Sequence, residues 1–379
     1  MIHLNGHSEC SGCTACYAVC PHGAITMQTD ALGFAYPSID PNICIGCNLC
    51  DKVCTFRKDY PAQTELNQQE YIAARHKQED EVAKSRSGAV FAEMARYVLA
   101  QNGVVYGAKQ DESLKVVHTK ITSQENLDVI RGSKYSQSDL QDILGDVKAE
   151  LASGRLVLFS GTPCQVSGLL GFMRNKEYPN LLTVDIVCHG VIGPKILKDY
   201  ISFLEEEKGK KIKYFNFRDK ERFGWEMHKE SFSFDKQGAD KFDYNFYLYD
   251  SLFFRPSCHI CPYTNFRRVG DITLADFWGI KRMQHPFNDN KGVSLLLINN
   301  AKGRSLFDKI SHKLDCFDVN KDAAVQPSLL YPVPQKAIAN AFAEYYGRFG
   351  FGRTMKKFNR LGWRKYIRRF KKKILNIDD

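Results

Sequence analysis

Eight cysteines near the amino terminus lie in two runs of the same spacing, C-x2-C-x2-C-x3-C, at residues 10–20 and 44–54. This spacing is the bacterial ligand pattern for paired [4Fe-4S] clusters, in which the fourth cysteine of each run binds the cluster of the other run. We therefore expect two clusters, and their chemistry is one-electron transfer. The first would be held by Cys10, Cys13, Cys16 and Cys54, and the second by Cys44, Cys47, Cys50 and Cys20.

A disulfide knot and a pair of zinc sites are two other interpretations of these cysteines. Disulfides are rare in reducing compartments, and residues 1–12 lack the apolar run of a secretion signal. Zinc sites take their ligands in pairs rather than in triads with a trailing cysteine. No apolar segment approaches the roughly 20 residues that span a bilayer. The sequence therefore favours iron-sulfur clusters in a cytoplasmic protein.

Five cysteines lie outside the two runs. We expect a third [4Fe-4S] cluster on Cys164, Cys188, Cys258 and Cys261, because ligands far apart in sequence serve equally well when the fold unites them. A zinc site on the same four residues, or four unligated core cysteines, are the alternatives. Cys316 is predicted to be an inert core thiol.

The elements that would position these cysteines change in type along the chain. A small hairpin is expected between the two runs, with strands at 24–27 and 34–37. From residue 71 onward, helices and strands alternate, which is typical of an α/β domain. We predict an α+β ferredoxin-like dicluster domain at 1–58, a linker at 59–70, an α/β domain with a mixed, partly parallel sheet at 71–335, and a helical basic tail at 336–379.

Two units of the α/β domain place a cysteine just past a buried strand. The apolar run 155–159 precedes Cys164 and a helix that begins near Gln165, and the run 181–187 precedes Cys188. Ligands bind at that edge in open α/β sheets. Other expected elements are helices at 89–101 and 194–208, a buried strand at 293–298, a hairpin from 212–217 and 225–234, and an aromatic-rich helix at 244–254.

Short motifs follow the cysteine runs, and their combination resembles a known family. They are Ser87-Gly88, the loop 132–138, Gly161-Thr162-Pro163-Cys164-Gln165, Cys188-His189-Gly190, Cys258-His-Ile-Cys261 and Ala275-Asp276-Phe-Trp278-Gly279. With the crossed ferredoxin runs, they look like the family of beta subunits of coenzyme F420 hydrogenases and dehydrogenases. The resemblance covers roughly residues 1–330.

The resemblance implies a flavoprotein with FAD on the α/β domain. Iron-sulfur clusters would feed the flavin, which would exchange hydride with a deazaflavin of the coenzyme F420 type or with another small molecule. Similar proteins are found together with polysaccharide-synthesis enzymes, so a small molecule of polysaccharide synthesis is the second substrate class. The implied cofactor-binding residues are Ser87, Gly88, Gly132, Ser133, Lys134, Tyr135, Gln137, Ser138, Gly161 and Thr162, and the candidate catalytic residue is His189.

These motifs also have ordinary structural interpretations. Ser87-Gly88 fits a helix cap, and the loop 132–138 fits a structural turn. His189 fits a hydrogen-bonded loop histidine, while Asp276 and Trp278 fit packing and capping roles. The chain departs from the family pattern at Ala89, where a second glycine often follows Ser-Gly. A methyl group there restricts the approach of backbone amides to a cofactor phosphate.

The excess of positive charge lies at the carboxyl end. Residues 353–379 hold eleven Lys and Arg and two Asp, so this tail accounts for +9 of the formal net charge of +10. Its apolar residues recur on one helical face, which is typical of a helix on an anionic surface. We expect peripheral contact with the inner face of a membrane, and the alternative is a solvated helix docked on its own domain. The rest of the chain is nearly neutral, so nucleic acid is not an expected partner.

Together, these features predict an iron-sulfur oxidoreductase that passes electrons between a partner, its clusters, a flavin and a small-molecule substrate. The expected partner is a redox protein or reduced ferredoxin. The alternative is an electron-relay subunit without a substrate of its own, which serves a partner enzyme. A third interpretation, a structural or nucleic-acid-associated metal protein, would hold redox-silent zinc.

Overall fold

The computed structural model describes residues 2–57, 69–236 and 250–358. Its amino-terminal domain is built around a hairpin of β1 (Ile25–Thr29) and β2 (Ala35–Ile39), which pair antiparallel as predicted. The Asp30 carboxylate closes the turn by accepting hydrogen bonds from the amides of Leu32 and Phe34, both at 2.9 Å. The other elements of this domain are the one-turn helices η1 (His7–Glu9), α1 (Ala15–Ala18) and α2 (Leu49–Lys52).

Eight strands form the central mixed sheet, and the predicted fold class is confirmed. Three neighbouring strand pairs, β10–β7, β7–β6 and β6–β4, are parallel, while the pairs toward both edges are antiparallel. In spatial order the strands are β12 (Leu314–Asp318), β3 (Glu70–His76), β11 (Ser294–Ile298), β10 (Ile272–Asp276), β7 (Leu181–Ile186), β6 (Val157–Gly161), β4 (Val104–Gln110) and β5 (Val116–Ile121).

Both faces of the sheet are covered, which explains the continuous apolar runs. Along β11, Leu296 packs into the core under the helices α4 (Val90–Ala100) and α9 (Ala301–Ile310), whereas Leu295 packs on the opposite face. Successive side chains of a strand point to opposite faces, so a strand covered on both sides is apolar throughout. The second face is covered in part by α5 (Ile143–Ala152) and α6 (Pro163–Phe172).

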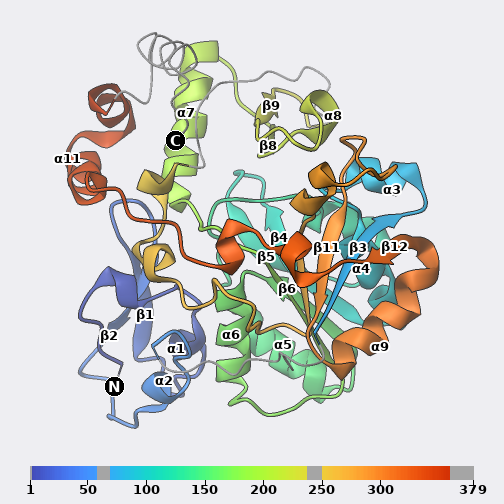
Figure 1. The fold of residues 1–379 in the computed structure, drawn as a ribbon. Helices are drawn as coiled ribbons and strands as arrows, with labels where there is room; N and C mark the ends of the chain where they lie inside the picture. Colours follow the sequence, from blue (N-terminus) through green and yellow to red (C-terminus); the bar gives the residue numbers. More distant parts are fainter. Residues whose placement is uncertain (1, 58–68, 237–249, 359–379) are drawn as a thin grey trace.

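Helix α6 also packs against the ferredoxin domain. Figure 1 shows this helix between that domain and the sheet. A Cβ placed on Gly168 would lie 2.5 Å from Cβ of Cys13, and one on Gly171 would lie 2.5 Å from the carbonyl oxygen of Val53. The two glycines are three residues apart and therefore share one helix face. Their missing side chains allow the ligand loops to contact the helix backbone.

A core rich in aromatic residues joins the hairpin of the ferredoxin domain to helices α7 (Pro194–Lys208) and α11 (Ala339–Lys357). It contains Phe34 and Tyr36 of the ferredoxin domain together with Tyr200 and Phe342. The elements that contribute to it are α7, β8 (Tyr214–Asn216), β9 (Ser231–Ser233), η3 (Ser251–Phe253) and α11. The short helix α8 (Lys220–Phe223) lies between β8 and β9 in the chain. The remaining short helices are α3 (Glu79–Lys84), η2 (Gln124–Ile130), η4 (Pro256–Ile260), η5 (Trp278–Arg282), η6 (Ser311–Lys313), α10 (Lys321–Ala324) and η7 (Pro327–Leu329).

Two predictions need correction. Cys316 is exposed rather than buried, because β12 is an edge strand and presents this residue to solvent. The aromatic helix expected at 244–254 is not formed in its described part, where Ser251–Phe253 is a single 3-10 turn and residues 244–249 lie outside the described ranges. The hairpin expected nearby is present but shorter, with β8 and β9 as its strands.

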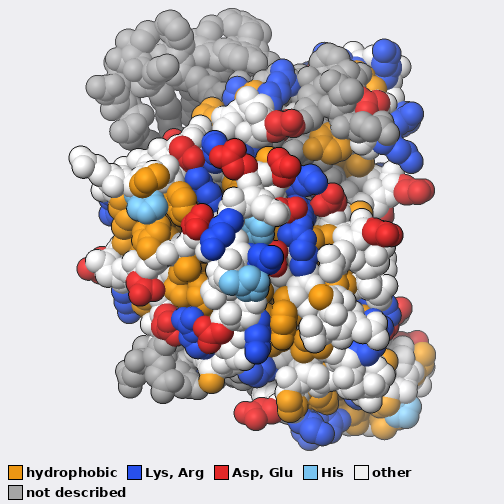
Figure 2. All heavy atoms as spheres, turned by 90° about the vertical axis from the view of Figure 1, so that its right-hand side faces the viewer, with side chains coloured by type: hydrophobic (Ala, Val, Ile, Leu, Met, Phe, Trp, Pro, Cys, Tyr) orange, Lys and Arg blue, Asp and Glu red, His pale blue; other side chains and the backbone are white. Residues whose placement is uncertain are grey.

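One face of the molecule carries charged side chains of both signs. The face that holds α3, α9 and β12 mixes Lys and Arg with Asp and Glu (Figure 2). Pairs such as Lys291 with Glu79, at 2.7 Å, account for part of this mixture.

Within the described ranges, none of the helices is both long and apolar enough to cross a bilayer. The amphipathic helix predicted for the tail falls on 359–379, outside those ranges.

Candidate functional site

The cysteines of the two amino-terminal runs come together in the crossed order that their spacing predicts. The first three cysteines of the first run and Cys54 line one cavity of about 20 Å³. Those of the second run and Cys20 line another cavity of about 20 Å³. Burial raises the pKa of Cys13 to about 12, so the uncharged thiol is favoured there until a positive centre offsets the desolvation. Iron would supply that positive charge, and these donor sets fit the clusters expected from the spacing.

Four more cysteines surround a third cavity, of about 30 Å³, although they lie far apart in sequence. Cys164 lies in the first turn of α6 after strand β6, Cys188 follows β7, and Cys258 and Cys261 lie in and just after η4. The two parallel strands end at the same edge of the sheet, which is why their cysteines meet. Burial raises the pKa of Cys188, Cys258 and Cys261 to about 12 each.

No tight metal-ion cluster accompanies these cavities. Across residues 2–57, 69–236 and 250–358, no three His, Cys, Asp or Glu side chains converge closely enough to hold a single metal ion. The four thiols of the third set instead line a space that also touches Phe56 and Tyr263.

Arg268 holds two of the segments around this third cavity, and no motif in the sequence indicates its role. Its guanidinium donates to the carbonyl oxygen of Ile186 at 3.0 Å, two residues before Cys188, and to that of Tyr263 at 2.6 Å, two residues after Cys261. Arg268 is buried and pairs with Asp185 at 3.3 Å. The two hydrogen bonds to carbonyl oxygens tie the two cysteine loops to the same side chain.

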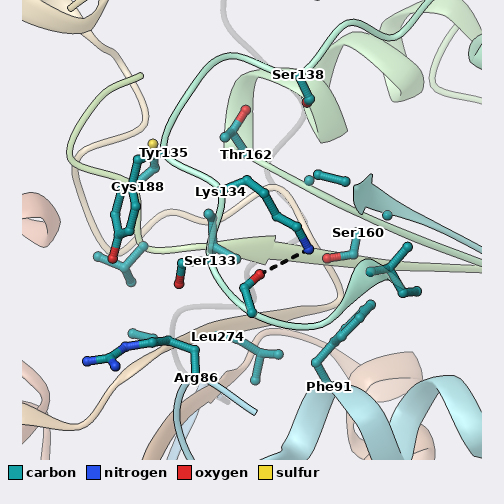
Figure 3. Close-up of a pocket in the computed structure, with 18 of the residues that line it drawn as sticks. Arg86, Phe91, Ser133, Lys134, Tyr135, Ser138, Ser160, Thr162, Cys188 and Leu274 are labelled. Carbon is teal, nitrogen blue, oxygen red and sulfur yellow. Dashed lines mark hydrogen bonds between the residues drawn. The ribbon is translucent and has the colours of Figure 1, made fainter. Parts of the chain in front are cut away.

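A larger cavity, of about 300 Å³, lies at the carboxyl ends of β6, β7 and β10. Of the ten residues that the family resemblance implied for cofactor binding, nine line it, and His189 does as well. In Figure 3 the Lys134 side chain points into the middle of the cavity, with Leu274 and Phe91 below it, and the Arg86 guanidinium points away from Lys134. The Lys134 ammonium donates to the carbonyl oxygen of Arg131 at 2.5 Å, and its burial lowers its pKa to about 7.

Gly88 is the exception among the ten, because it lies behind the cavity wall. A Cβ on Gly88 would lie 2.2 Å from the carbonyl oxygen of Ala74 and 2.8 Å from the amide nitrogen of Ser294. The glycine therefore allows the loop to pass close to strands β3 and β11. Ala89 lines the cavity and has φ = 68°, a left-handed conformation that favours glycine. This accounts for the glycine that often stands here in the family pattern.

A chain of hydrogen bonds makes one wall of the cavity rigid. His118 donates from Nε2 to the carbonyl oxygen of Ser160 at 3.0 Å and accepts at Nδ1 from the Ser138 hydroxyl at 2.8 Å. The Ser138 hydroxyl in turn accepts from the Gln165 amide at 2.8 Å. Burial lowers the pKa of His118 to about 4, so the ring is neutral and this arrangement is fixed. Ser138 thus holds the wall in place, in addition to facing the cavity.

The third cavity and the larger cavity share a wall. Both are lined by Thr162, Cys164, Cys188, His189, Gly190 and Val191. The His189 ring packs edge-on against Tyr135 and Phe254, with centroids 5.5 and 5.4 Å away. Burial, with a smaller contribution from Arg218, lowers the pKa of His189 to about 4. A neutral histidine in an aromatic wall fits packing better than proton donation at neutral pH.

Asp276 and Trp278 occupy a packed cluster at the edge of the larger cavity. The Asp276 carboxylate accepts from Arg218 at 2.6 Å and from Nε1 of Trp225 at 2.8 Å. The Trp225 and Trp278 rings stack with centroids 4.6 Å apart. These contacts fit the packing interpretation, and Asp276 also lines the larger cavity, as its interpretation as a site residue requires.

Comparison with known proteins agrees with this arrangement. Residues 9–58 match the 4Fe-4S dicluster domain, and residues 154–320 match the family described as the carboxyl-terminal part of the coenzyme F420 hydrogenase/dehydrogenase beta subunit. The family and the dicluster domain predicted from the motifs are confirmed over these two ranges. This beta-subunit segment holds all four cysteines of the third cavity and the shared wall.

One curated relative extends the comparison over most of the chain. The chain is 21% identical over 367 residues to a subunit of the F(420)H(2) dehydrogenase of Methanosarcina mazei, a match that covers 91% of this chain and 94% of the relative. A chain of the F420-reducing [NiFe] hydrogenase complex from Methanosarcina barkeri aligns with a TM-score of 0.48 and 16% identity, covering 76% of this chain and 90% of that one. The family and domain matches make this chain an iron-sulfur electron-transfer protein related to the beta subunits, with a role of the oxidoreductase type.

Proposed function

We propose that the chain is a flavin-containing iron-sulfur oxidoreductase that moves electrons along a line of four cofactors. The line runs from the cluster of the second cysteine run, through that of the first run and a third cluster on Cys164, Cys188, Cys258 and Cys261, to FAD in the larger cavity. The observation that carries the proposal is the continuity of the cavities. The third cavity shares Ser11 and Phe56 with the cavity of the first run, and six residues with the larger cavity.

The position and the chemistry of the larger cavity support a bound flavin. Ligands of α/β folds bind at the carboxyl ends of the strands, and about 300 Å³ is at the lower end of the usual range for ligand pockets. Lys134 and the polar residues of 132–138 would orient FAD, while Phe91 and Leu274 would cover it on the other side. FAD, when bound, collects single electrons and delivers them in pairs as hydride.

The substrate in this proposal is a reducible small molecule that reaches the flavin from the side away from the shared wall. A deazaflavin of the coenzyme F420 type is the first choice, because the Methanosarcina mazei relative is named for that cofactor in its reduced form. A substrate of polysaccharide synthesis is the second. A redox protein would exchange electrons with the cluster of the second run, where Cys47 is exposed and the neighbouring Ile45 is 66% exposed.

The competing function is that of an electron relay with no substrate of its own. Anaerobic purification, followed by measurement of iron, acid-labile sulfide, zinc and flavin in one sample, separates the two. Three clusters and a flavin give about twelve irons and one flavin per chain, which is the result we expect. About eight irons without flavin would overturn the oxidoreductase and leave a ferredoxin-type relay. Zinc in place of the third cluster would overturn the proposed electron path.

A further inference from the structure

Arg255 joins the two domains from a fully buried position, with 1% of its surface exposed. Its guanidinium donates to the carbonyl oxygens of Cys10 at 2.7 Å and Ala35 at 2.9 Å, both in the ferredoxin domain. It also donates to the side-chain oxygen of Gln137 at 2.8 Å, and Gln137 donates back to the carbonyl oxygen of Ser11 at 2.8 Å. One arginine therefore connects a ligand loop, the hairpin and the loop that lines the larger cavity.

The contact is close enough to require a glycine. A Cβ on Gly12, which has φ = 72°, would lie 2.7 Å from Nη1 of Arg255 and 2.8 Å from Nε2 of Gln137. Gly12 stands between the cluster ligands Cys10 and Cys13, so the guanidinium lies against the ligand loop itself. Nη2 also approaches the Cys10 sulfur at 3.5 Å.

Arg255 differs from the other buried arginines because no carboxylate pairs with it in the described part of the chain. Within the ranges that the structure describes, it forms no ion pair with an Asp or Glu; its neighbours are carbonyl oxygens, an amide and the rings of Tyr36 and Phe34. A buried cation is costly unless a negative charge or strong hydrogen bonds compensate it. The other buried arginines each meet a carboxylate: Arg75 with Asp289 at 2.6 Å, Arg131 with Glu81 at 2.5 Å, Arg218 with Asp276 at 2.6 Å and Arg268 with Asp185 at 3.3 Å.

Cysteine sites flank Arg255 on two sides. Arg255 lines the third cavity, three residues before Cys258, and contacts the sulfur of Cys10 in the first. An iron-sulfur cluster held by four thiolates is anionic overall and becomes more negative on reduction.

We propose that Arg255 is the shared counter-charge of the cluster held by Cys10 and of the third cluster, and that it raises the reduction potential of both. A nearby cation stabilises the more negative, reduced form of a cluster. The cluster of the second run, whose cavity Arg255 does not line, would keep a lower potential, so that electrons flow inward toward the α/β domain. The part that concerns the third cluster rests on the proposed function, whereas the part that concerns Cys10 rests on the dicluster domain alone.

The test is a redox titration of the anaerobically purified full chain, with the reduced clusters followed by electron paramagnetic resonance. In Arg255→Gln, the ratio of oxidised to reduced cluster at Cys10 should rise about tenfold at a fixed solution potential, equivalent to about 59 mV for one electron. The cluster of the second run should not shift, which makes it an internal control. Arg255→Lys, which keeps the charge, should shift less than Arg255→Gln.

Arg75→Gln is the matched control, because it removes the same charge from a buried arginine on strand β3, across the sheet from the ferredoxin domain (Figure 1). It should leave every cluster potential unchanged. The proposal is overturned if Arg255→Gln retains its iron without a shift at Cys10, or if the Lys and Gln variants shift equally. If Arg255→Gln loses iron, Arg255→Lys must retain iron and a near-native potential, or the charge role is wrong. A wild-type protein with about eight irons would remove the third cluster, while the shift at Cys10 would still decide the role of Arg255.

Discussion

The two groups of cysteines are built in different ways. The ligands of the ferredoxin cavities come from residues 10–54 alone, on loops whose geometry repeats: Thr14 and Asn48 have φ near 60°, and Gly12 and Gly46 near 72°. Those of the third cavity come from separate segments between 164 and 261, and the ends of two parallel strands bring them together. The first kind of site is specified by local spacing, whereas the second exists only when the whole sheet has formed.

This difference predicts that each group of cysteines can lose its cluster while the other group keeps its own. Damage to the third group should leave the ferredoxin clusters intact, while damage to the docking face of α6 should affect both.

The largest expected effect follows loss of a ligand from the third group. Cys261→Ala should remove about four of twelve irons per chain and leave the eight of the ferredoxin domain, because each set of four thiolates holds its own cluster. Iron analysis and electron paramagnetic resonance of the reduced protein measure this. Cys316→Ala, on the exposed edge strand, is the control and should retain all the iron. Wild-type iron in Cys261→Ala would show that the third group holds no cluster.

The next effect is on docking between the two regions. Gly168→Val should lower stability by about 3 kcal/mol, the upper part of the range for overpacking, because the new side chain would overlap Cys13. Thermal unfolding and iron content would both report the damage. Gly145→Ala is the matched control in α5, where a Cβ meets nothing within 4 Å, and it should raise stability by up to about 1 kcal/mol. Equal behaviour of the two variants would contradict the contact.

The pH dependence of flavin binding tests the larger cavity alone. The Lys134 pKa is lowered to about 7, so the side chain is cationic below pH 7 and neutral above it. The anionic phosphates of FAD bind better to the cation, and affinity should fall about tenfold between pH 6.5 and pH 8.5. Titration of the flavin-depleted protein with FAD by fluorescence measures the change. Lys134→Gln should bind weakly at every pH, and a fall of the wild-type size in that variant would assign the effect to another group.

The smallest effect concerns the helix start beside the same cavity. Ala89→Gly should raise the free energy of unfolding by about 0.5 kcal/mol, since relief of the left-handed conformation exceeds the added entropy of the unfolded chain. Thermal unfolding of the purified protein would detect the shift. Ala92→Gly, inside α4, should instead lower stability by about 1 kcal/mol. A loss of stability in both variants would mean that Ala89 is not strained.

The sequence predicted the features that depend on neighbours along the chain. Cysteine spacing predicted the crossed grouping of Cys20 and Cys54, and apolar runs located strands β6, β7 and β11. The family resemblance supplied the residues of the larger cavity, nine of ten of which line it. Neither argument required knowledge of contacts between distant segments.

What the sequence did not predict depends on such contacts. Arg255 and Arg268 act on carbonyl groups of segments remote in sequence, and an arginine near a cysteine motif carries no mark that it is buried. Gly168 and Gly171 were a weak signal, a small-residue pair on one helix face that fits close packing. Cys316 was predicted wrongly because an apolar residue in a strand is buried only if the strand is covered, and β12 lies at the edge.

The shared wall has a consequence for redesign of the protein. Six residues face both the third cavity and the larger one, so a substitution there alters two compartments at once, and any change in substrate choice is confounded with a change in electron supply. Arg86, Phe91 and Leu274 line the larger cavity only. A library of variants confined to these three positions can explore new substrates while the residues around the third cavity stay unchanged.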